Sequence, residues 1–287
     1  VLFRSVGKTL LMRRRFAQLD VCADKPLLGN PLAVVVDAED LDSEQMQTFA
    51  RWTNLSETTF LLPPTNSSAD YRVRIFTPTE ELPFAGHPTL GSAFAWLTHG
   101  GSQKQQGFIV QECGVGFVTV RQENRTLAFK APPLLRGGPA EETVVLEAAI
   151  ALGIERSSII DAAWVDNGPG WLGLMLASAD EVLSIKPRAM DLTVGVVGFY
   201  PIGAPFKYEV RAFYPKGGAT IEDPVTGSLN ASLAQWLIGN GVVTAPYKAS
   251  QGKAMGHAGI VHISTDDSGA VWIGGNVMLC VEGSVDL

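Results

Sequence analysis

Four polar side chains stand beside glycine or proline turns and could carry out acid–base chemistry: Glu57, His87, Asp223 and Ser228. Glu57 precedes the apolar stretch 58–62, which is typical of a buried strand. Burial of a carboxyl group raises its pKa toward the range useful for general acid–base catalysis. Glu57 would also suit a surface position at a strand end, His87 a neutral helix cap, and Asp223, which precedes a proline, an ordinary turn. The residue types alone leave both interpretations open.

His87 and Ser228 each follow a glycine at the start of a helix-like run. Gly86-His87-Pro88 precedes the run 89–97, and Gly227-Ser228 precedes the apolar run 229–238. The N–H groups at a helix N-terminus are unpaired and carry the positive end of the helix dipole, so both stretches are suited to bind a carboxylate. We expect Ser228 to cap the second helix.

The sequence around these two stretches is repeated. Residues 71–78 and 208–215 share the pattern Y-x-V-R-x-F-x-P, at an offset of 208 − 71 = 137 residues, and Trp96-Leu97 recurs as Trp236-Leu237. Each copy contains a strand, a loop with glycine and a helix, which indicates a duplicated domain rather than a solenoid. Ligands often bind between domains, and we expect both helix N-termini to face a cleft between the two halves.

Composition excludes several classes of function. The net charge of −7 disfavours nucleic acid or an anionic membrane as a partner. The longest apolar run, 194–206, is interrupted by glycines and prolines and cannot span a membrane. The three cysteines are an odd number without metal-like spacing, which favours a reducing cytoplasm, and the four scattered histidines do not predict a zinc site. Neither common nucleotide-binding motif is present.

Strand-like stretches dominate, without the strand–helix alternation of a doubly wound sheet. We therefore predict an α+β fold with two pseudo-symmetric domains, each a curved antiparallel β-barrel-like sheet around a central helix. Residues 15–133 would form the N-terminal half, with the last C-terminal strand possible as an addition, and residues 134–287 the C-terminal half. The Pro- and Gly-rich stretch 131–139 is the best candidate for a linker between the two halves. We expect the basic residues 1–14 to lie outside the fold.

From about Phe16 to the C-terminus the chain resembles the PhzF-like family of phenazine biosynthesis proteins. The resemblance rests on five motifs in order: Gly29-Asn30-Pro31-Leu32-Ala33-Val34-Val35, Ser56-Glu57-Thr58-Thr59-Phe60, Glu81-Leu82-Pro83-Phe84-Ala85-Gly86-His87-Pro88-Thr89, Glu112-Cys113-Gly114-Val115-Gly116 and Glu222-Asp223-Pro224-Val225-Thr226-Gly227-Ser228. It implies a diaminopimelate-epimerase-like fold and a cofactor-free isomerase, often homodimeric, that acts on a small carboxylate.

The resemblance also assigns roles to the candidate residues. It implies that Glu57 moves a proton within the substrate, that His87 and Asp223 belong to the catalytic group, and that Ser228 binds substrate. Gly86 and Gly227 would let backbone N–H groups approach the substrate carboxylate. No residue is assigned to a metal.

Two features separate this chain from relatives. Epimerases of the same fold carry a pair of cysteines at the two helix starts, where this chain has His87 and Ser228, so a two-thiol racemase is disfavoured. The family usually reads Q-G-x-x-x-G-R near its end, whereas this chain has His257 in place of the arginine and so lacks a fixed bidentate donor there. Two alternatives stay open: a non-catalytic small-molecule binding protein, and an epimerase that uses Glu57 with His87 or Asp223.

Overall fold

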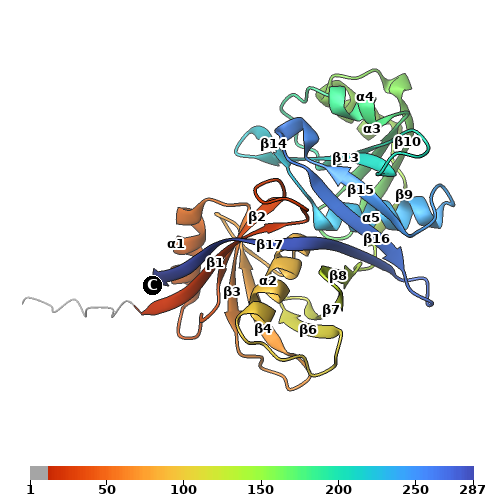
Figure 1. Cartoon of the computed structure of the whole chain (residues 1–287). Helices are drawn as coiled ribbons and strands as arrows, with labels where there is room; N and C mark the ends of the chain where they lie inside the picture. The colour runs from red at the N-terminus through yellow and green to blue at the C-terminus, as the bar shows by residue number, and fades with distance from the viewer. Residues whose placement is uncertain (1–11) are drawn as a thin grey trace, which may run out of the picture.

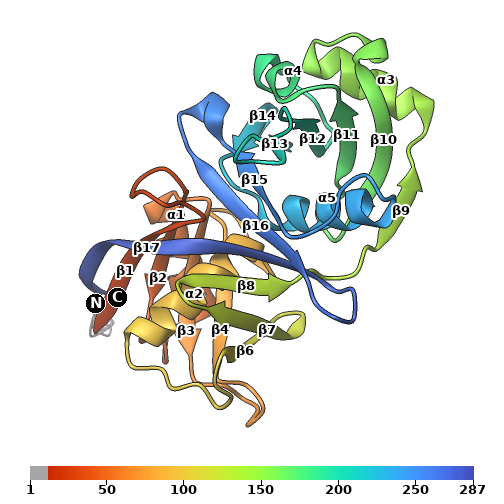
Figure 2. The same ribbon diagram turned by 45° about the vertical axis from the view of Figure 1, so that its right-hand side comes forward.

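Two curved sheets, each wrapped around one helix, make up the α+β fold of the computed structural model, which describes residues 12–287 (Figures 1 and 2). In the N-terminal half, strands β1, β2, β3, β4, β6, β7, β8 and β17 pair in that order, and β17 pairs back with β1 to close a ring. The bounds are β1 Arg13–Val21, β2 Asn30–Val35, β3 Glu57–Leu62, β4 Tyr71–Phe76, β5 Glu81–Leu82, β6 Phe108–Cys113, β7 Gly116–Glu123, β8 Thr126–Lys130 and β17 Val271–Asp286. Helix α2 (Gly86–Thr98) lies inside this ring and α1 (Ser43–Thr53) outside it.

The C-terminal half repeats this order of strands around α5 (Gly227–Gly239). Its elements are β9 Arg136–Pro139, α3 Glu142–Leu152, the 3-10 turn η1 Arg156–Ser158, β10 Ile159–Asp166, β11 Leu172–Leu176, α4 Ala179–Ser184, β12 Val194–Phe199, β13 Tyr208–Lys216, β14 Ala219–Asp223, β15 Tyr247–Gln251, the 3-10 turn η2 Lys253–Met255 and β16 Gly259–Thr265. Both halves contain two parallel pairs, β2–β3 with β4–β6 and β11–β12 with β13–β15. The sheets are therefore mixed, where the sequence predicted antiparallel ones.

The repeated sequence pattern corresponds to one structural unit in each half. Its arginine lies on β4 as Arg74 and on β13 as Arg211. Arg74 pairs with Glu81 of β5 at 2.6 Å, and Arg211 pairs with Glu222 of β14 at 2.7 Å. The predicted duplication is confirmed, because the same pair ties the strand before each central helix to the short strand that follows it.

The two halves exchange their last strands. β17 first pairs with β8 through Trp272–Asn276 and then with β1 through Val277–Asp286, so the end of the chain closes the N-terminal ring. In return, β9 follows β8 and pairs with β10 of the C-terminal half. The predicted linker 131–139 therefore ends in a strand.

The fold begins earlier than predicted. Residues 13 and 14 were expected outside the fold, but Arg13 opens β1 opposite Asp286. Arg14 is 5% exposed and donates to the carbonyls of Asp37 and Glu39. Residues 1–11 of the predicted extension lie outside the described residues.

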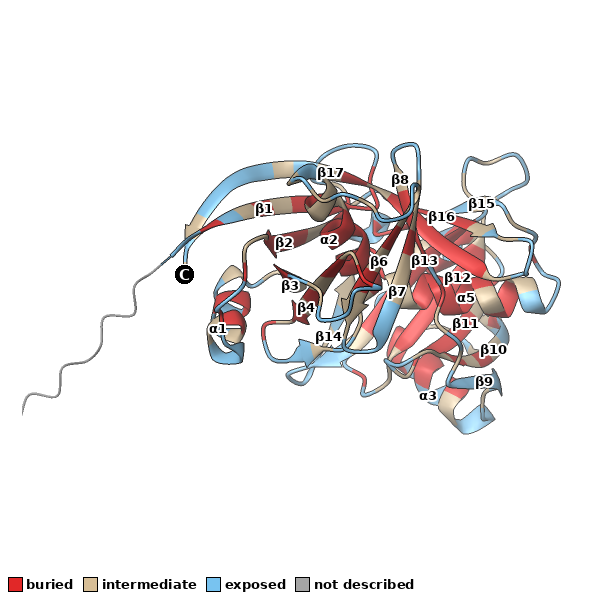
Figure 3. Ribbon diagram, turned by 90° about the horizontal axis from the view of Figure 1, so that it is seen from below, coloured by how far each residue is buried: buried red, intermediate tan, exposed pale blue. Residues whose placement is uncertain are grey.

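A continuous apolar core holds the two central helices in place (Figure 3). Leu90 and Ala93 of α2 and Leu229 and Leu233 of α5 are buried in the same cluster of side chains. At about 1.5–3 kcal/mol for each fully buried large side chain, this packing fixes the position of both helices. The core thereby determines where the helix N-termini, and the residues beside them, lie.

Candidate active site

The N-termini of α2 and α5 meet at the boundary between the halves. A Cβ atom on Gly86 would lie 2.8 Å from Cα of Gly227, and one on Gly227 would lie 2.7 Å from Cα of Gly86. Only glycine fits at either position, since a side chain would overlap the backbone of the opposite helix. Within residues 12–287 no side chain caps either helix. The first-turn N–H groups of both helices are therefore available to a ligand.

Ser228 does not cap α5, contrary to the prediction. The N-cap is Thr226, whose hydroxyl donates instead to Oδ2 of Asp223 at 2.6 Å. Ser228 is the second residue of the helix, and its Oγ accepts from Nε1 of Trp171 at 3.0 Å. Its half-buried side chain stays beside Gly227 at the helix start, and its role in substrate binding remains a prediction.

Glu57 is the first residue of β3, and its side chain is 15% exposed. Oε2 of Glu57 lies 3.3 Å from Nε2 of His87, although the two atoms are not aligned as a hydrogen bond. Burial, reinforced by the charge of Asp223, raises the pKa of Glu57 from 4.5 to about 8, against a smaller effect of Lys216. The structure thus favours the buried interpretation of Glu57 over the surface one.

His87 and Asp223 lie next to Glu57 but differ in charge. His87, the second residue of α2, is 5% exposed, and burial lowers its pKa to about 3. Burial raises the pKa of Asp223, the last residue of β14, to about 6, opposed by hydrogen bonds from Thr226 and Asn30. Near neutral pH each of the two carboxyl groups can therefore gain or lose a proton, whereas His87 stays a neutral imidazole.

Two buried amides join the site residues, and the sequence analysis did not single out either. Nδ2 of Asn30, the first residue of β2, donates to Oδ1 of Asp223 and to the Val225 carbonyl, both at 2.9 Å. Nε2 of Gln251 donates to the carbonyl of Asp223, and its Oε1 accepts from the N–H of Thr226. Asn30 stands in a motif quoted for the family resemblance, and Gln251 begins the stretch that departs from the family pattern at His257, but a linear motif does not show that its side chains reach another segment.

The β13–β14 hairpin adds two more residues to the site. Because Ala212 is opposite Asp223 in the ladder, Tyr214 and Lys216 lie on the same face of the hairpin as Asp223. The hairpin projects from the C-terminal half toward the N-terminal half (Figures 1 and 3). Burial and the nearby charges of Asp223 and Glu57 raise the pKa of Tyr214 to about 12.

His257, which occupies the position of the family's usual arginine, also touches this region. Its Nδ1 lies 2.8 Å from the carbonyl oxygen of Gly29, the residue before Asn30. The contact joins the loop after η2 in the C-terminal half to the start of β2 in the N-terminal half. A histidine can thus make an inter-half contact at this position.

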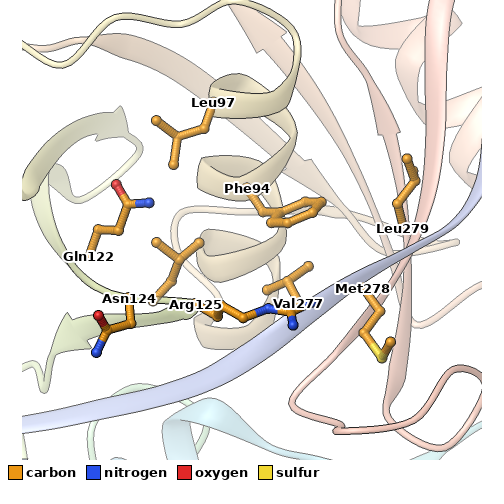
Figure 4. Close-up of a pocket in the computed structure, with 9 residues that line it drawn as sticks. Phe94, Leu97, Gln122, Asn124, Arg125, Val277, Met278 and Leu279 are labelled. Atoms are coloured by element: carbon orange, nitrogen blue, oxygen red, sulfur yellow. The ribbon is translucent and has the colours of Figure 1, made fainter.

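Metal ligands, membrane-spanning helices and other pockets also bear on the function of the described part of the chain. No group of three or more His, Cys, Asp or Glu side chains there could hold a metal ion. No helix of residues 12–287 is long and apolar enough to cross a membrane. A pocket of about 320 Å³ lies between α2, the β7–β8 turn and β17, and none of the predicted site residues line it (Figure 4).

Comparison with known proteins identifies the family of this chain. Residues 19–283 match the family described as phenazine biosynthesis-like protein. The chain belongs to this family. It is 37% identical to antisense-enhancing sequence 1 of Schizosaccharomyces pombe, over 93% of this chain and 97% of that protein. It is 34% identical to trans-2,3-dihydro-3-hydroxyanthranilate isomerase of Pseudomonas aeruginosa, over 94% of this chain and 98% of that protein.

A solved structure of the phenazine biosynthesis-like family has the same fold. The PhzF-family protein of Bacillus anthracis superposes with a TM-score of 0.81 at 20% identity, over 96% of this chain and 100% of that one. The predicted α+β fold of two related halves is thereby confirmed. The prediction of an isomerase is confirmed at the level of the family, whose members include proteins named as isomerases.

Proposed function

We propose that this member of the phenazine biosynthesis-like family is a cofactor-independent isomerase in which Glu57 moves a proton within a small carboxylate substrate bound between the halves. One observation carries the proposal. Glu57 is a largely buried carboxyl group with a pKa of about 8 that faces a neutral imidazole beside two uncapped helix N-termini. A group with this pKa is available near neutral pH both as a base and as an acid.

In this mechanism the substrate carboxylate accepts hydrogen bonds from the first-turn N–H groups of α2 and α5. The ionised form of Glu57 takes a proton from a carbon acidified by neighbouring unsaturation. The C–H bond breaks, an O–H bond forms on Glu57, and the electron pair moves into the conjugated system. Glu57 then returns the proton to another carbon of the same molecule. His87 and Asp223 orient the substrate, and Ser228 hydrogen-bonds to it.

Proton NMR in D2O tests this function with a panel of small cyclic and amino carboxylates. The panel includes trans-2,3-dihydro-3-hydroxyanthranilate, because the Pseudomonas relative is named for that compound. We expect deuterium to enter a substrate carbon with wild type, to fall at least 10²-fold with Glu57→Gln, and to be unchanged with Glu147→Gln, an exposed glutamate of α3. Full activity of the Glu57→Gln variant would refute the role of Glu57.

Two alternatives predict different outcomes of the same experiment. Ligand-induced shifts without exchange for any bound compound would favour a non-catalytic binding protein. Exchange at a single stereocentre with inversion would indicate an epimerase, for which the unlike carboxyl groups of Glu57 and Asp223, with pKa values of about 8 and about 6, supply two acid–base groups.

We also propose a homodimer and a cytoplasmic location. The family resemblance supports the dimer, which light scattering on the purified protein checks directly. The odd number of cysteines supports the location, which fractionation of the source cells checks.

A further inference from the structure

Asn30 connects three parts of the site, although it lies at the start of a strand rather than at either helix. Its side chain is fully buried. Nδ2 of Asn30 lies 2.9 Å from Oδ1 of Asp223, 2.9 Å from the Val225 carbonyl oxygen and 3.3 Å from Nδ1 of His87. Asp223 and Val225 belong to the C-terminal half, and His87 and Asn30 to the N-terminal half. One amide thus links both halves to the two residues beside Glu57.

The surroundings determine which way the Asn30 amide faces. The carbonyl of Val225 can only accept a hydrogen bond, and an ionised Asp223 carboxylate can only accept as well. The NH2 group of Asn30 must therefore face them, since the opposite orientation would bring three oxygens together. Oδ1 of Asn30 is buried without a hydrogen-bond partner among the described residues, so the amide is held from its NH2 side.

This orientation determines the tautomer of His87. Nδ1 of His87 lies 3.3 Å from Nδ2 of Asn30, whose two hydrogens also serve Asp223 and Val225, and a proton on Nδ1 would point at this donor nitrogen and be repelled. Nδ1 therefore keeps its lone pair, and in a neutral imidazole the proton then resides on Nε2. Nε2 is the atom that lies 3.3 Å from Oε2 of Glu57. The protonation of the ring nitrogen nearest Glu57 is thus fixed by an amide on the far side of the ring.

We propose that Asn30 is the positioning residue of this site, which holds Asp223 as a carboxylate and His87 as its Nε2–H tautomer toward Glu57. The inference rests on the proposed function of Glu57. Asn30 touches neither the substrate carboxylate site nor Glu57 by any hydrogen bond found here, and it acts through its two neighbours. Its position between the halves also makes the arrangement dependent on their contact.

The charges around Asp223 allow the effect of Asn30 to be isolated. The titratable or charged groups around this carboxyl group come from five segments. Glu57, Tyr214, Glu222 and His257 interact with Asp223 electrostatically, and His87 and Lys216 lie beside Glu57. Only Thr226 and Asn30 donate side-chain hydrogen bonds to it among the described residues. Loss of the Asn30 donor leaves the surrounding charges in place and removes one of these two bonds.

Two variants test the proposal by NMR without any need for a substrate. Asn30→Leu and Asn30→Ala both remove the amide donor without adding a charge, and they differ in the volume of the side chain that replaces it. Long-range 1H–15N spectra of the histidine rings report the His87 tautomer, and 13C-labelled aspartate reports the titration of Asp223. In both variants we expect the Asp223 titration to move upward by about one pH unit and the Nε2–H signature of His87 to be lost or mixed.

Asn276→Leu is the matched control, because Asn276 also donates from its Nδ2 to an aspartate, Asp24, and among the described residues it makes no hydrogen bond to Asp223 or His87. It should leave both signals unchanged. With an active substrate, Asn30→Ala should lower kcat more than it raises KM and should displace the pH profile. Folded Asn30 variants with the wild-type tautomer and wild-type Asp223 titration would overturn the proposal. Spectral changes as expected, but no proton exchange even in wild type, would refute the proposed function alone.

Discussion

Replacement of Glu57 by glutamine should stabilise the folded protein at alkaline pH, even though it removes the proposed catalytic group. The pKa of Glu57 is raised from 4.5 to about 8, so between these values the folded state holds a proton that the unfolded state has lost. Stability then falls as pH rises through this window. Glutamine has nearly the same shape and carries no charge, so the variant does not lose this stability.

The size of the effect follows from the shift. At about 1.4 kcal/mol per pH unit, the Glu57 contribution changes by about 4 kcal/mol between pH 5 and pH 9. For a chain of this size that is roughly 8–16 °C in melting temperature. Below pH 6 the titrations of Asp223 and His87 also change stability, but wild type and variant share them. The gap in melting temperature between the two proteins should therefore widen from pH 5 to pH 9.

Calorimetry or thermal circular dichroism of both proteins across this range measures the gap. The control is Glu147→Gln, at an exposed position of α3, whose gap should stay constant with pH. A gap for Glu57→Gln that also stays constant would show that Glu57 ionises normally in the folded protein. That result would remove the basis for its role as an acid–base group, whatever the substrate is.

Two further predictions concern activity and packing. The kcat/KM for proton exchange should rise about tenfold per pH unit below pH 8 and level off above it, because Glu57 must be ionised to act as a base; a flat profile measured between pH 6 and pH 9 would contradict this role. Gly86→Ala should destabilise the protein by about 1–3 kcal/mol, since its Cβ would lie 2.8 Å from Gly227. Gly239→Ala, at the end of α5 where a Cβ meets nothing within 4 Å, should be neutral or slightly stabilising in the same denaturant titration.

Local chemistry made part of this fold predictable from the sequence. Aspartate and asparagine are typical of helix ends, and the structure shows Asp42 in a capping box at the start of α1 and Asn54 in the left-handed conformation with φ 53° at its end. The central helices were predicted from apolar runs that end at glycines. Such signals act within a few residues of chain, so one sequence suffices to detect them.

The features that the sequence did not predict depend on contacts between distant segments. The exchange of β9 and β17 is a pairing of strands far apart in the chain. The four parallel pairs arise because α1, α2, α4 and α5 each lie between the two paired strands and return the chain to the same end of the sheet. Thr226 occupies the N-cap position of α5, and its hydroxyl donates to Asp223. Ser228, the second residue of the helix, accepts a hydrogen bond from Trp171 instead. Nothing near Asn30 in the sequence indicates that its side chain donates to Asp223.

The duplicated fold holds an asymmetric set of chemical groups. The parallel pair β2–β3 of the N-terminal half corresponds to β11–β12 of the C-terminal half. In this correspondence Glu57, opposite Leu32, occupies the position that Val194, opposite Leu172, has in the other half. It also equates Asp223, opposite Ala212, with Leu82, opposite Ile75. Each half thus supplies one carboxyl group where the other half has an apolar residue, and the two groups come together only because the helices meet at Gly86 and Gly227.

This asymmetry bears on the type of reaction. A racemase gains from two equivalent groups that face each other across a stereocentre, since its forward and reverse reactions are mirror images. Here burial gives Glu57 a pKa of about 8 and Asp223, with its two donors, a pKa of about 6. At pH 7 the first therefore mostly holds a proton and the second mostly does not, while His87 stays neutral. An unlike pair of this kind suits a reaction whose two ends differ, as when one group carries a proton from one carbon to another and its neighbour keeps a fixed negative charge.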